Sequence, residues 1–405
     1  MKRRQLLAGL GAGAVALAGC GREQPAAGVD SPASPAAPAE IINWKMVTTW
    51  PPNFPGTGTS ATLLAETINR ASGGRIKVHV YAAGELVPPF EVFNAVSAGA
   101  AEIGHGVSYY WKAQVEAAQF FGAIPFGMTP AESSAWLHFG GGMELWRELY
   151  EPFGVMVFTG GNTGTQMGGW FNREINSPDD LRGLKMRIPG LGGEVLQRAG
   201  GTPVMLPGGE IYTAMQTGSV DATEWVGPYN DVGFGLHEVA QYYYYPGWHE
   251  PGAILEVSIN QEAWDALPED LQEVVKSACG HMESLLGAEY SARNAQFLQQ
   301  LRNEGKIEIR PFPDSVIAEL RLRSQEVIDE LIARDENAAR IYASYTAFQQ
   351  HSDTSACRGA TIASVNSSCT TDIDATMPGF IDPPGFAIVN SIGKVRFSGS
   401  TVTPA

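Results

Sequence analysis

Residues 41–47 read IINWKMV, residues 75–81 read RIKVHVY and residues 101–104 read AEIG, and these three runs decide the fold class. Each has the length and the apolar or alternating pattern of a β-strand. Helical patterns fill the intervals between them, over residues 59–72 and residues 89–98. The order strand, helix, strand, helix, strand predicts an α/β fold with a largely parallel sheet and helices outside it.

The following part of the chain continues this alternation. Strands are expected at residues 154–158, 166–172 and 184–188, and helices at residues 193–200 and 210–218. From residue 262 to about residue 350 the pattern is helical, with a strand at 307–309 and one long amphipathic helix over 315–350. Two α/β blocks followed by helices predict two α/β lobes with mostly parallel sheets. A small ligand is expected to bind in the cleft between them.

The first residues have the order of a secretory signal. The basic triplet KRR precedes an apolar run over residues 6–18, and Leu-Ala-Gly precedes Cys20. The run is too short to span a bilayer, which needs about 20 residues, so a signal peptide is predicted over residues 1–20. Small residues before a cysteine resemble the lipobox of bacterial lipoproteins, in which the cysteine carries the lipid. The alternative is an ordinary signal with an incidental Cys20.

Two segments are predicted to lie outside the packed core. Residues 21–40 are rich in proline, alanine and serine and predict a flexible tether. Residues 351–405 contain no Leu, Glu, Gln, Trp or Tyr, and the composition changes abruptly after residue 350. An atypical, disordered C-terminal tail is therefore expected.

The net charge narrows the choice of partners. The chain carries 27 Lys+Arg and 43 Asp+Glu, a formal net charge of −16, and removal of the three basic signal residues brings it to −19. Such a surface repels nucleic acid and anionic lipid, so neither is an expected partner, and a lipid anchor is the only membrane contact. An anionic ligand must then be met by a specific local cation.

The four cysteines do not form a zinc-like spacing. Cys20 is the predicted lipid-bearing cysteine. Cys279 lies in an apolar, helix-like stretch and is predicted to be a small core residue. Cys357 and Cys369 could form a disulfide with each other, and the sequence leaves this open.

Three segments combine residue types that suit ligand binding. Residues 160–170 read GGNTGTQMGGW, which places amides among glycines where backbone can approach a ligand closely. Residues 185–189 read KMRIP, so an arginine at the end of an apolar strand could hold a carboxylate bidentately. Residues 221–228 read DATEWVGP, an acid and an indole before a turn. Each pattern also fits a plain turn, a surface arginine or a core tryptophan.

Four longer stretches carry a family resemblance. They read DLRGLKMR at 180–187, GSVDA at 218–222, TEWVGPYND at 223–231 and YPGWHEPG at 245–252. Together they resemble the DctP-type substrate-binding proteins of TRAP transporters, which are tripartite, ATP-independent uptake systems. The last two stretches resemble the branch that binds 2-oxo or 2-hydroxy monocarboxylates such as pyruvate and lactate. The resemblance covers about residues 41–350.

This resemblance implies a bilobed fold, like that of periplasmic binding proteins, whose lobes close on the ligand. Lobe I is expected to comprise residues 41–164 and 252–290, and lobe II residues 165–251 and 291–350. The TRAP permease subunits in the membrane are the implied partners. Members of this branch usually continue with helical sequence after residue 350, and some dimerise through it. A homodimer therefore stays open here, where the atypical tail replaces that sequence.

The resemblance also implies a site in which a cation, Na⁺ or Ca²⁺, bridges protein and substrate oxygens. Arg187 matches the arginine that pairs with the substrate carboxylate. The residues expected to contact the substrate are Arg187, Gln166, Trp225, Tyr109, Tyr110 and Asn162. The expected metal ligands are Glu224, Gln166, the Trp225 carbonyl and Glu250, because hard cations prefer oxygen ligands.

Two alternatives remain beside an extracytoplasmic solute receptor. The first is an exported enzyme acting on 2-oxoacids, with Glu224 or His249 as general base. The sequence contains neither Gly-x-Ser-x-Gly nor His-Glu-x-x-His, which favours binding over catalysis. The second alternative is a lipoprotein that senses the ligand and signals without transport.

Overall fold

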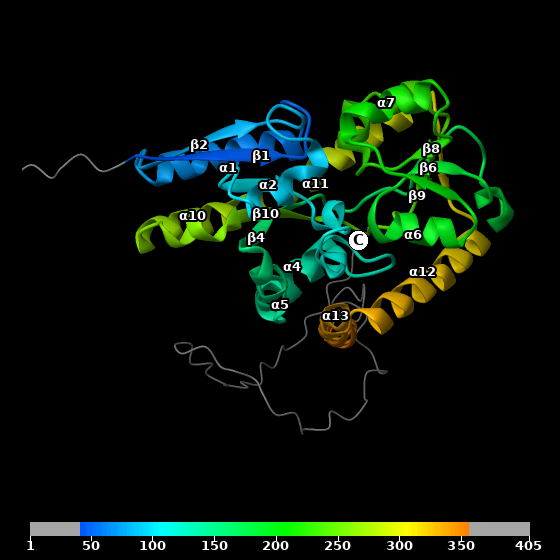
Figure 1. Cartoon of the computed structure of the whole chain (residues 1–405). Coiled ribbons are helices and arrows are strands. Elements are labelled where there is room, and N and C mark those ends of the chain that lie inside the picture. The colour runs from blue at the N-terminus through cyan, green and yellow to red at the C-terminus, as the bar shows by residue number, and fades with distance from the viewer. Residues whose placement is uncertain (1–40, 356–405) are drawn as a thin grey trace, which may run out of the picture. The chain divides into compact units, whose positions relative to one another are not determined.

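The first of two β-sheets is built mainly from the N-terminal part of the chain (Figure 1), in a computed structural model that describes residues 41–355. Its strand order is β2-β1-β3-β10-β4. The strands are β1 (Ile42–Thr48), β2 (Ile76–Tyr81), β3 (Ile103–Gly106), β4 (Val155–Asn162) and β10 (Ile254–Asn260). The helices in this part of the sequence are α1 (Thr57–Ala71), α2 (Val92–Ser97), α3 (Gln119–Gly122), α4 (Pro130–Phe139), α5 (Gly142–Tyr150), α10 (Gln261–Asp265) and α11 (Glu269–Glu304). This sheet with the helices packed on it is called the first lobe below.

The second sheet has the strand order β11-β9-β5-β8-β6-β7. Its strands are β5 (Gly169–Phe171), β6 (Lys185–Arg187), β7 (Thr202–Val204), β8 (Ala222–Thr223), β9 (Tyr242–Tyr245) and β11 (Glu308–Pro311). The remaining helices are α6 (Gly190–Arg198), α7 (Gly208–Gln216), α8 (Pro228–Gly233), α9 (Leu236–Val239), α12 (Asp314–Arg334) and α13 (Glu336–Ser355). This sheet and its helices are called the second lobe, and α12 packs against α6 of this lobe.

Both sheets are mixed, with five of the nine strand pairings parallel. Strand β10 runs antiparallel between β3 and β4, and β5 runs antiparallel to both β8 and β9. The chain therefore crosses between the sheets three times: from β4 to β5, from β9 to β10 and from β10 to β11. These crossings place the loops after β4 and β9 next to the junction of the lobes.

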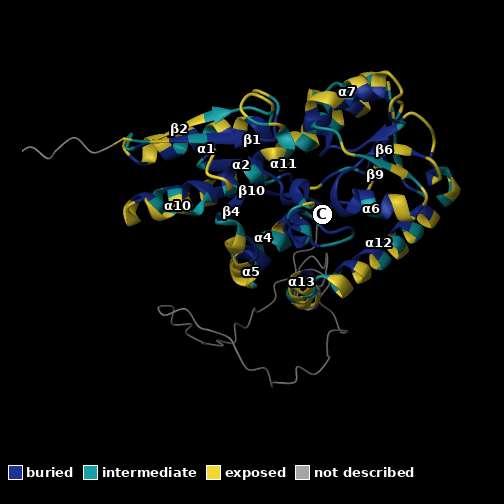
Figure 2. Ribbon diagram, viewed as in Figure 1, coloured by how far each residue is buried: buried dark blue, intermediate teal, exposed yellow. Residues whose placement is uncertain are grey.

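The predicted helix periodicity explains how the first lobe packs. Helix α1 buries Leu64 and Ile68 completely, one turn apart, while its other face is exposed. Figure 2 shows this division along the long helices, with buried bands facing the sheets and exposed bands facing away. Burial of one such side chain stabilises the fold by about 1.5–3 kcal/mol.

The prediction of a single helix over residues 315–350 was wrong at one point. The chain breaks between α12 and α13 at Asp335, whose backbone is extended (φ −127°, ψ 114°). The Asp335 carboxylate accepts a hydrogen bond of 3.0 Å from the Ala338 N–H, as an N-terminal capping residue does. The apolar periodicity continues on both sides of the break, so it hides the change of direction. The strand expected at 166–172 is also shorter, covering Gly169–Phe171.

Cys279 is buried and free in α11, which confirms it as a core residue, and burial raises the pKa of its thiol to about 12. Cys20, Cys357, Cys369, the signal, the tether and nearly all of the tail lie outside the described residues. Within the part that is described, no helix is long and apolar enough to cross a membrane.

Strand β10 carries a fully buried acid, Glu256, that has no part in the ligand site described below. The Tyr150 hydroxyl donates a hydrogen bond of 2.8 Å to Glu256 Oε2, and the Trp111 indole N–H donates to the Tyr150 oxygen at 2.7 Å. Oxygen Oε1 of Glu256 has no protein partner. Burial raises the pKa of Glu256 from 4.5 to about 8.

We expect this acid to make the protein less stable as the pH rises between 4.5 and about 8. The carboxyl group is protonated in the folded protein across this window and ionised in the unfolded chain. The stabilisation of the folded state by the protonated carboxyl group is therefore complete below pH 4.5. It is lost as the pH approaches 8, at about 1.4 kcal/mol per pH unit. Urea unfolding of the wild-type protein and of Glu256→Gln at pH 5 and pH 7.5 measures the effect. The prediction is contradicted if the free energy of unfolding depends on pH equally in the wild-type protein and in Glu256→Gln. Glu308→Gln, which replaces an exposed acid, is the control.

Candidate functional site

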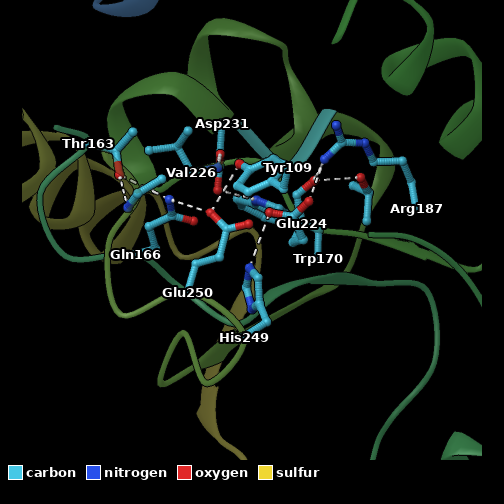
Figure 3. A network of polar contacts seen from close by, with 12 residues as sticks. Tyr109, Thr163, Gln166, Trp170, Arg187, Glu224, Val226, Asp231, His249 and Glu250 are labelled. Atoms are coloured by element: carbon cyan, nitrogen blue, oxygen red, sulfur yellow. Dashed lines mark hydrogen bonds and ion pairs between the residues drawn. The ribbon is translucent and has the colours of Figure 1, made fainter. Parts of the chain in front are cut away.

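A cluster of buried charged residues lies where strands β6, β8 and β9 end in the second lobe (Figure 3). Arg187 is the last residue of β6, and Glu224 directly follows β8. The two strands are parallel neighbours, and the Glu224 N–H donates to the Arg187 carbonyl at 3.1 Å. Because parallel strands end at the same edge of a sheet, their following side chains meet there.

Arg187 is 1% exposed and uses most of its donors inside the protein. Its Nε donates to the Leu206 carbonyl at 3.1 Å, and Nη1 pairs with the Glu224 carboxylate and reaches the Glu224 carbonyl at 3.2 Å. Nη2 donates to the Tyr110 hydroxyl at 3.3 Å, and the guanidinium carbon lies 5.0 Å from the centre of the Trp225 ring. Burial alone would lower the pKa of Arg187, but the Glu224 carboxylate together with Tyr110 and Tyr109 outweighs it and the pKa is raised. The arginine therefore stays charged.

Three further groups converge on Arg187 from the loops after β8 and β9. Ligand atoms of Glu224, His249 and Glu250 all lie within 4.8 Å of one another, and all three residues are buried. His249 Nε2 is 3.1 Å from Glu224 Oε2. Burial would lower the pKa of His249, but its hydrogen bond to Glu224 and the charges of Glu224 and Glu250 together outweigh burial and raise it. Burial and then the charge of Glu224 raise the pKa of Glu250 from 4.5 to about 7.

Residues of the first lobe and of the crossing loop complete the network. The Tyr109 hydroxyl donates to Glu250 Oε2 at 3.2 Å, and Gln166 Nε2 donates to the same oxygen at 3.1 Å. Tyr109 and Tyr110 lie on the short 3₁₀ helix Ser108–Trp111, which follows β3. Burial raises the pKa of Tyr109 well above its usual value and that of Tyr110 to about 12, so both hydroxyls remain protonated donors.

The donor set fits a cation. Gln166 gives its amide hydrogens to Thr163 and Glu250, which leaves the buried Gln166 Oε1 without a partner. Together with the carboxylate oxygens of Glu224 and Glu250, it offers the oxygen ligands that Na⁺ and Ca²⁺ prefer. Glu224 and Glu250 place two carboxyl groups side by side in the interior, and the burial of like charges so close together is costly. A bound cation would offset that cost.

Most of the residues predicted from the sequence come together in this network. They are Arg187, Gln166, Trp225, Tyr109, Tyr110, Glu224 and Glu250. Asn162 is the exception. Its Oδ1 accepts a hydrogen bond of 3.1 Å from the Gly164 N–H, and its carboxamide packs beside Gly287 of α11.

Two residues at the site carry roles that the sequence did not indicate. The sequence suggests His249 only as a general base, although its position next to Glu250 places it in the same loop. Asp231 belongs to the stretch TEWVGPYND, and its buried carboxylate accepts hydrogen bonds from the Trp170 indole, the Tyr243 hydroxyl and the Val226 N–H. These contacts fix the segment that follows Trp225. Burial raises the pKa of Asp231 to about 7.

The fold and this network can be compared with known proteins. The sequence profile described as DctP, bacterial extracellular solute-binding protein, family 7, matches residues 46–335. The chain belongs to this DctP family. This DctP protein is 40% identical over 352 residues to a monocarboxylate 2-oxoacid-binding periplasmic protein of Nostoc sp.. The aligned region covers 86% of this chain and 94% of that relative.

Two solved structures of TRAP periplasmic solute-binding proteins resemble this DctP protein. The protein from Pseudoalteromonas atlantica, with bound sodium and pyruvate, is 40% identical with a TM-score of 0.75, covering 77% of this chain and 95% of that one. The protein from Colwellia psychrerythraea, with bound calcium and pyruvate, is 38% identical with a TM-score of 0.75, covering 78% and 98%. The bilobed α/β fold and the interpretation as a TRAP solute receptor are thereby confirmed. These comparisons favour a solute receptor over an exported enzyme, and membership of the family indicates a periplasmic location.

Proposed function

We propose that this receptor captures a small 2-oxo or 2-hydroxy monocarboxylate together with Na⁺ or Ca²⁺, and delivers it to the membrane subunits of a TRAP transporter. The observation that carries the proposal is a single buried arginine beside three oxygen-bearing side chains, Glu224, Glu250 and Gln166. A 2-oxoacid presents a carboxylate next to a carbonyl. The carboxylate matches the Arg187 guanidinium, and the adjacent oxygens match the neighbouring cation site.

Arg187 is the proposed anchor of the carboxylate. Its guanidinium is held by the Leu206 and Glu224 carbonyls and by Tyr110, so its charge has a fixed position and one Nη2 hydrogen remains for a ligand oxygen. Tyr110 accepts a hydrogen bond from Arg187 and keeps its own hydrogen for a ligand oxygen. Tyr109 and Tyr110 come from the first lobe, so closure of the lobes completes the site.

Glu224, Glu250, Gln166 and the Trp225 carbonyl are the proposed holders of the cation. When bound, the cation supplies positive charge that attracts both oxygens of a 2-oxoacid and offsets the buried carboxylates. The Tyr109 hydroxyl and the Gln166 amide orient Glu250 by donating to the same oxygen, which leaves its other oxygen for a ligand. Asn162, at the end of β4, is proposed to line the cleft without holding the cation.

The organisation of the chain around this site follows the same proposal. We infer that residues 41–164 and 252–290 form one lobe and residues 165–251 and 291–350 the other, with α11 crossing the boundary at residue 290; the support is that each sheet draws its strands from one of these pairs of ranges. We propose further that Cys20 carries a lipid anchor and that the protein returns its ligand chemically unchanged. One alternative is a signalling lipoprotein with the same site, which isolation of the membrane partner would detect. The other is a homodimer, which mass measurement in solution would detect.

A thermal-shift panel on metal-stripped protein tests the proposal. Pyruvate, lactate, longer 2-oxoacids, dicarboxylates and sialic acid are compared with and without Na⁺ or Ca²⁺. A ligand at 100 times its dissociation constant should stabilise the folded protein by about 2.7 kcal/mol. We expect monocarboxylates to stabilise it strongly only when a cation is present.

The same panel contains the contradicting outcomes. Stabilisation by dicarboxylates or sialic acid alone would overturn the 2-oxoacid specificity and the cation site. Recovery of the pyruvate after long incubation, measured by chromatography, separates a receptor from an enzyme. Consumption of pyruvate would establish the enzyme alternative.

A further inference from the structure

Phe126 has a backbone conformation that bulky residues rarely adopt. Its φ is 58°, and among the non-glycine residues that the structure describes only Asn53 shares a positive φ. Asparagine tolerates this left-handed region, whereas a phenylalanine there is a strained outlier. Such strain persists only where surrounding contacts fix it, and it is common at functional sites.

The contacts that fix Phe126 come from three parts of the chain. Its N–H donates to the Trp248 carbonyl at 2.8 Å, and the two rings lie 6.1 Å apart. The guanidinium carbon of Arg321, on α12, lies 4.2 Å from the centre of the Phe126 ring. Two residues later, the Met128 N–H donates to the Tyr345 hydroxyl of α13. The loop before α4 is thus held by both C-terminal helices while it contacts Trp248.

Trp248 connects this loop to the candidate cation site. It is 4% exposed and directly precedes His249 and Glu250. Its ring packs edge-on against the His249 ring at 5.5 Å. A shift of the Trp248 backbone would therefore move both following side chains relative to Glu224. The left-handed turn at Phe126 directs the N–H that fixes this backbone.

We propose that Phe126 is a positioning residue for the cation site, which holds Trp248 and thereby sets the places of His249 and Glu250. This inference rests on the proposed function, because it assumes that the cluster binds a cation. Phe126 contacts neither cation nor ligand, and it acts through Trp248. The strained conformation is retained because a relaxed one would turn the Phe126 N–H away from the Trp248 carbonyl.

The test compares Phe126→Gly with the wild-type protein. Glycine adopts positive φ without strain, so the loss of the ring is partly offset and the metal-free protein should keep most of its thermal stability. Glycine keeps the N–H hydrogen bond to Trp248 but removes the ring that packs against Trp248 and Arg321, so calcium affinity should fall about tenfold, as when a residue behind a metal ligand is removed. Tryptophan-sensitised luminescence of Tb³⁺ bound in place of Ca²⁺ gives a second readout of the site. Phe126→Asn, which also tolerates positive φ, repeats the test should the glycine variant fold poorly.

Conservative and remote variants separate positioning from stability. Phe126→Tyr keeps the ring and should restore wild-type calcium affinity. Phe153→Ala removes a partly buried ring of the first lobe and should lower the unfolding temperature without changing calcium affinity. Wild-type calcium affinity in Phe126→Gly would overturn this inference alone. A wild-type protein that binds neither Na⁺ nor Ca²⁺ would overturn the proposed function and this inference with it.

Discussion

Replacing Arg187 with Ala is expected to weaken pyruvate binding by roughly two to four orders of magnitude. The change removes the guanidinium that pairs with Glu224 in the buried network, and loss of one partner from a buried charge pair costs about 3–5 kcal/mol. It also removes one of the two buried partners of the Glu224 carboxylate, which are Arg187 and His249, so the metal-free protein should lose stability. Isothermal titration with pyruvate at saturating Ca²⁺ measures the affinity.

Two further variants identify the cause of that loss. Arg187→Lys keeps a positive charge but cannot reach Leu206, Glu224 and Tyr110 with one fork, so binding should be only partly retained. Arg198→Ala removes an arginine that pairs with Glu330 at the surface, where ion pairs contribute about 0–1 kcal/mol. It should leave the affinity unchanged. Wild-type affinity in Arg187→Ala would contradict the role given to this residue.

The sequence predicted the elements and residues whose position follows from local rules. The alternating run at 75–81 and the helical face around Leu64 specify their own period, and the structure has a strand and a helix there. The placement of Arg187 at a strand end predicted that it would project from the edge of a sheet. The neighbouring position of Glu224 then follows from the parallel pairing of β6 with β8.

Other features depend on contacts that local sequence does not encode. The break at Asp335 interrupts a continuous apolar pattern, so only the capping chemistry of one aspartate marks it. Asn162 lies one residue before Thr163 in a promising segment, yet its carboxamide packs beside α11, more than 100 residues later in the chain. The partnership of Phe126 with Trp248 likewise joins positions that are distant in sequence. These contacts follow from how the two lobes and the C-terminal helices meet.

Replacing Glu224 with Gln is expected to abolish the dependence of binding on a cation. Glutamine has nearly the same shape but no charge, so a hard cation would lose one of its two anionic ligands. The variant also frees Arg187 from its ion pair and changes the partner of His249 Nε2. We expect calcium affinity to fall about 100-fold or more, the upper range for loss of a supporting group. Pyruvate, if still bound weakly through Arg187, should bind equally with and without Ca²⁺.

A buried acid elsewhere provides the matched control for this variant. Glu283 on α11 accepts hydrogen bonds from Thr159 and pairs with His138, all in the first lobe. Glu283→Gln should therefore change stability without changing calcium affinity or the effect of Ca²⁺ on pyruvate binding. Titrations of both variants with Ca²⁺, followed by pyruvate, compare the two acids directly. A Glu224→Gln protein that still needs Ca²⁺ to bind pyruvate, with unchanged calcium affinity, would place the cation away from Glu224.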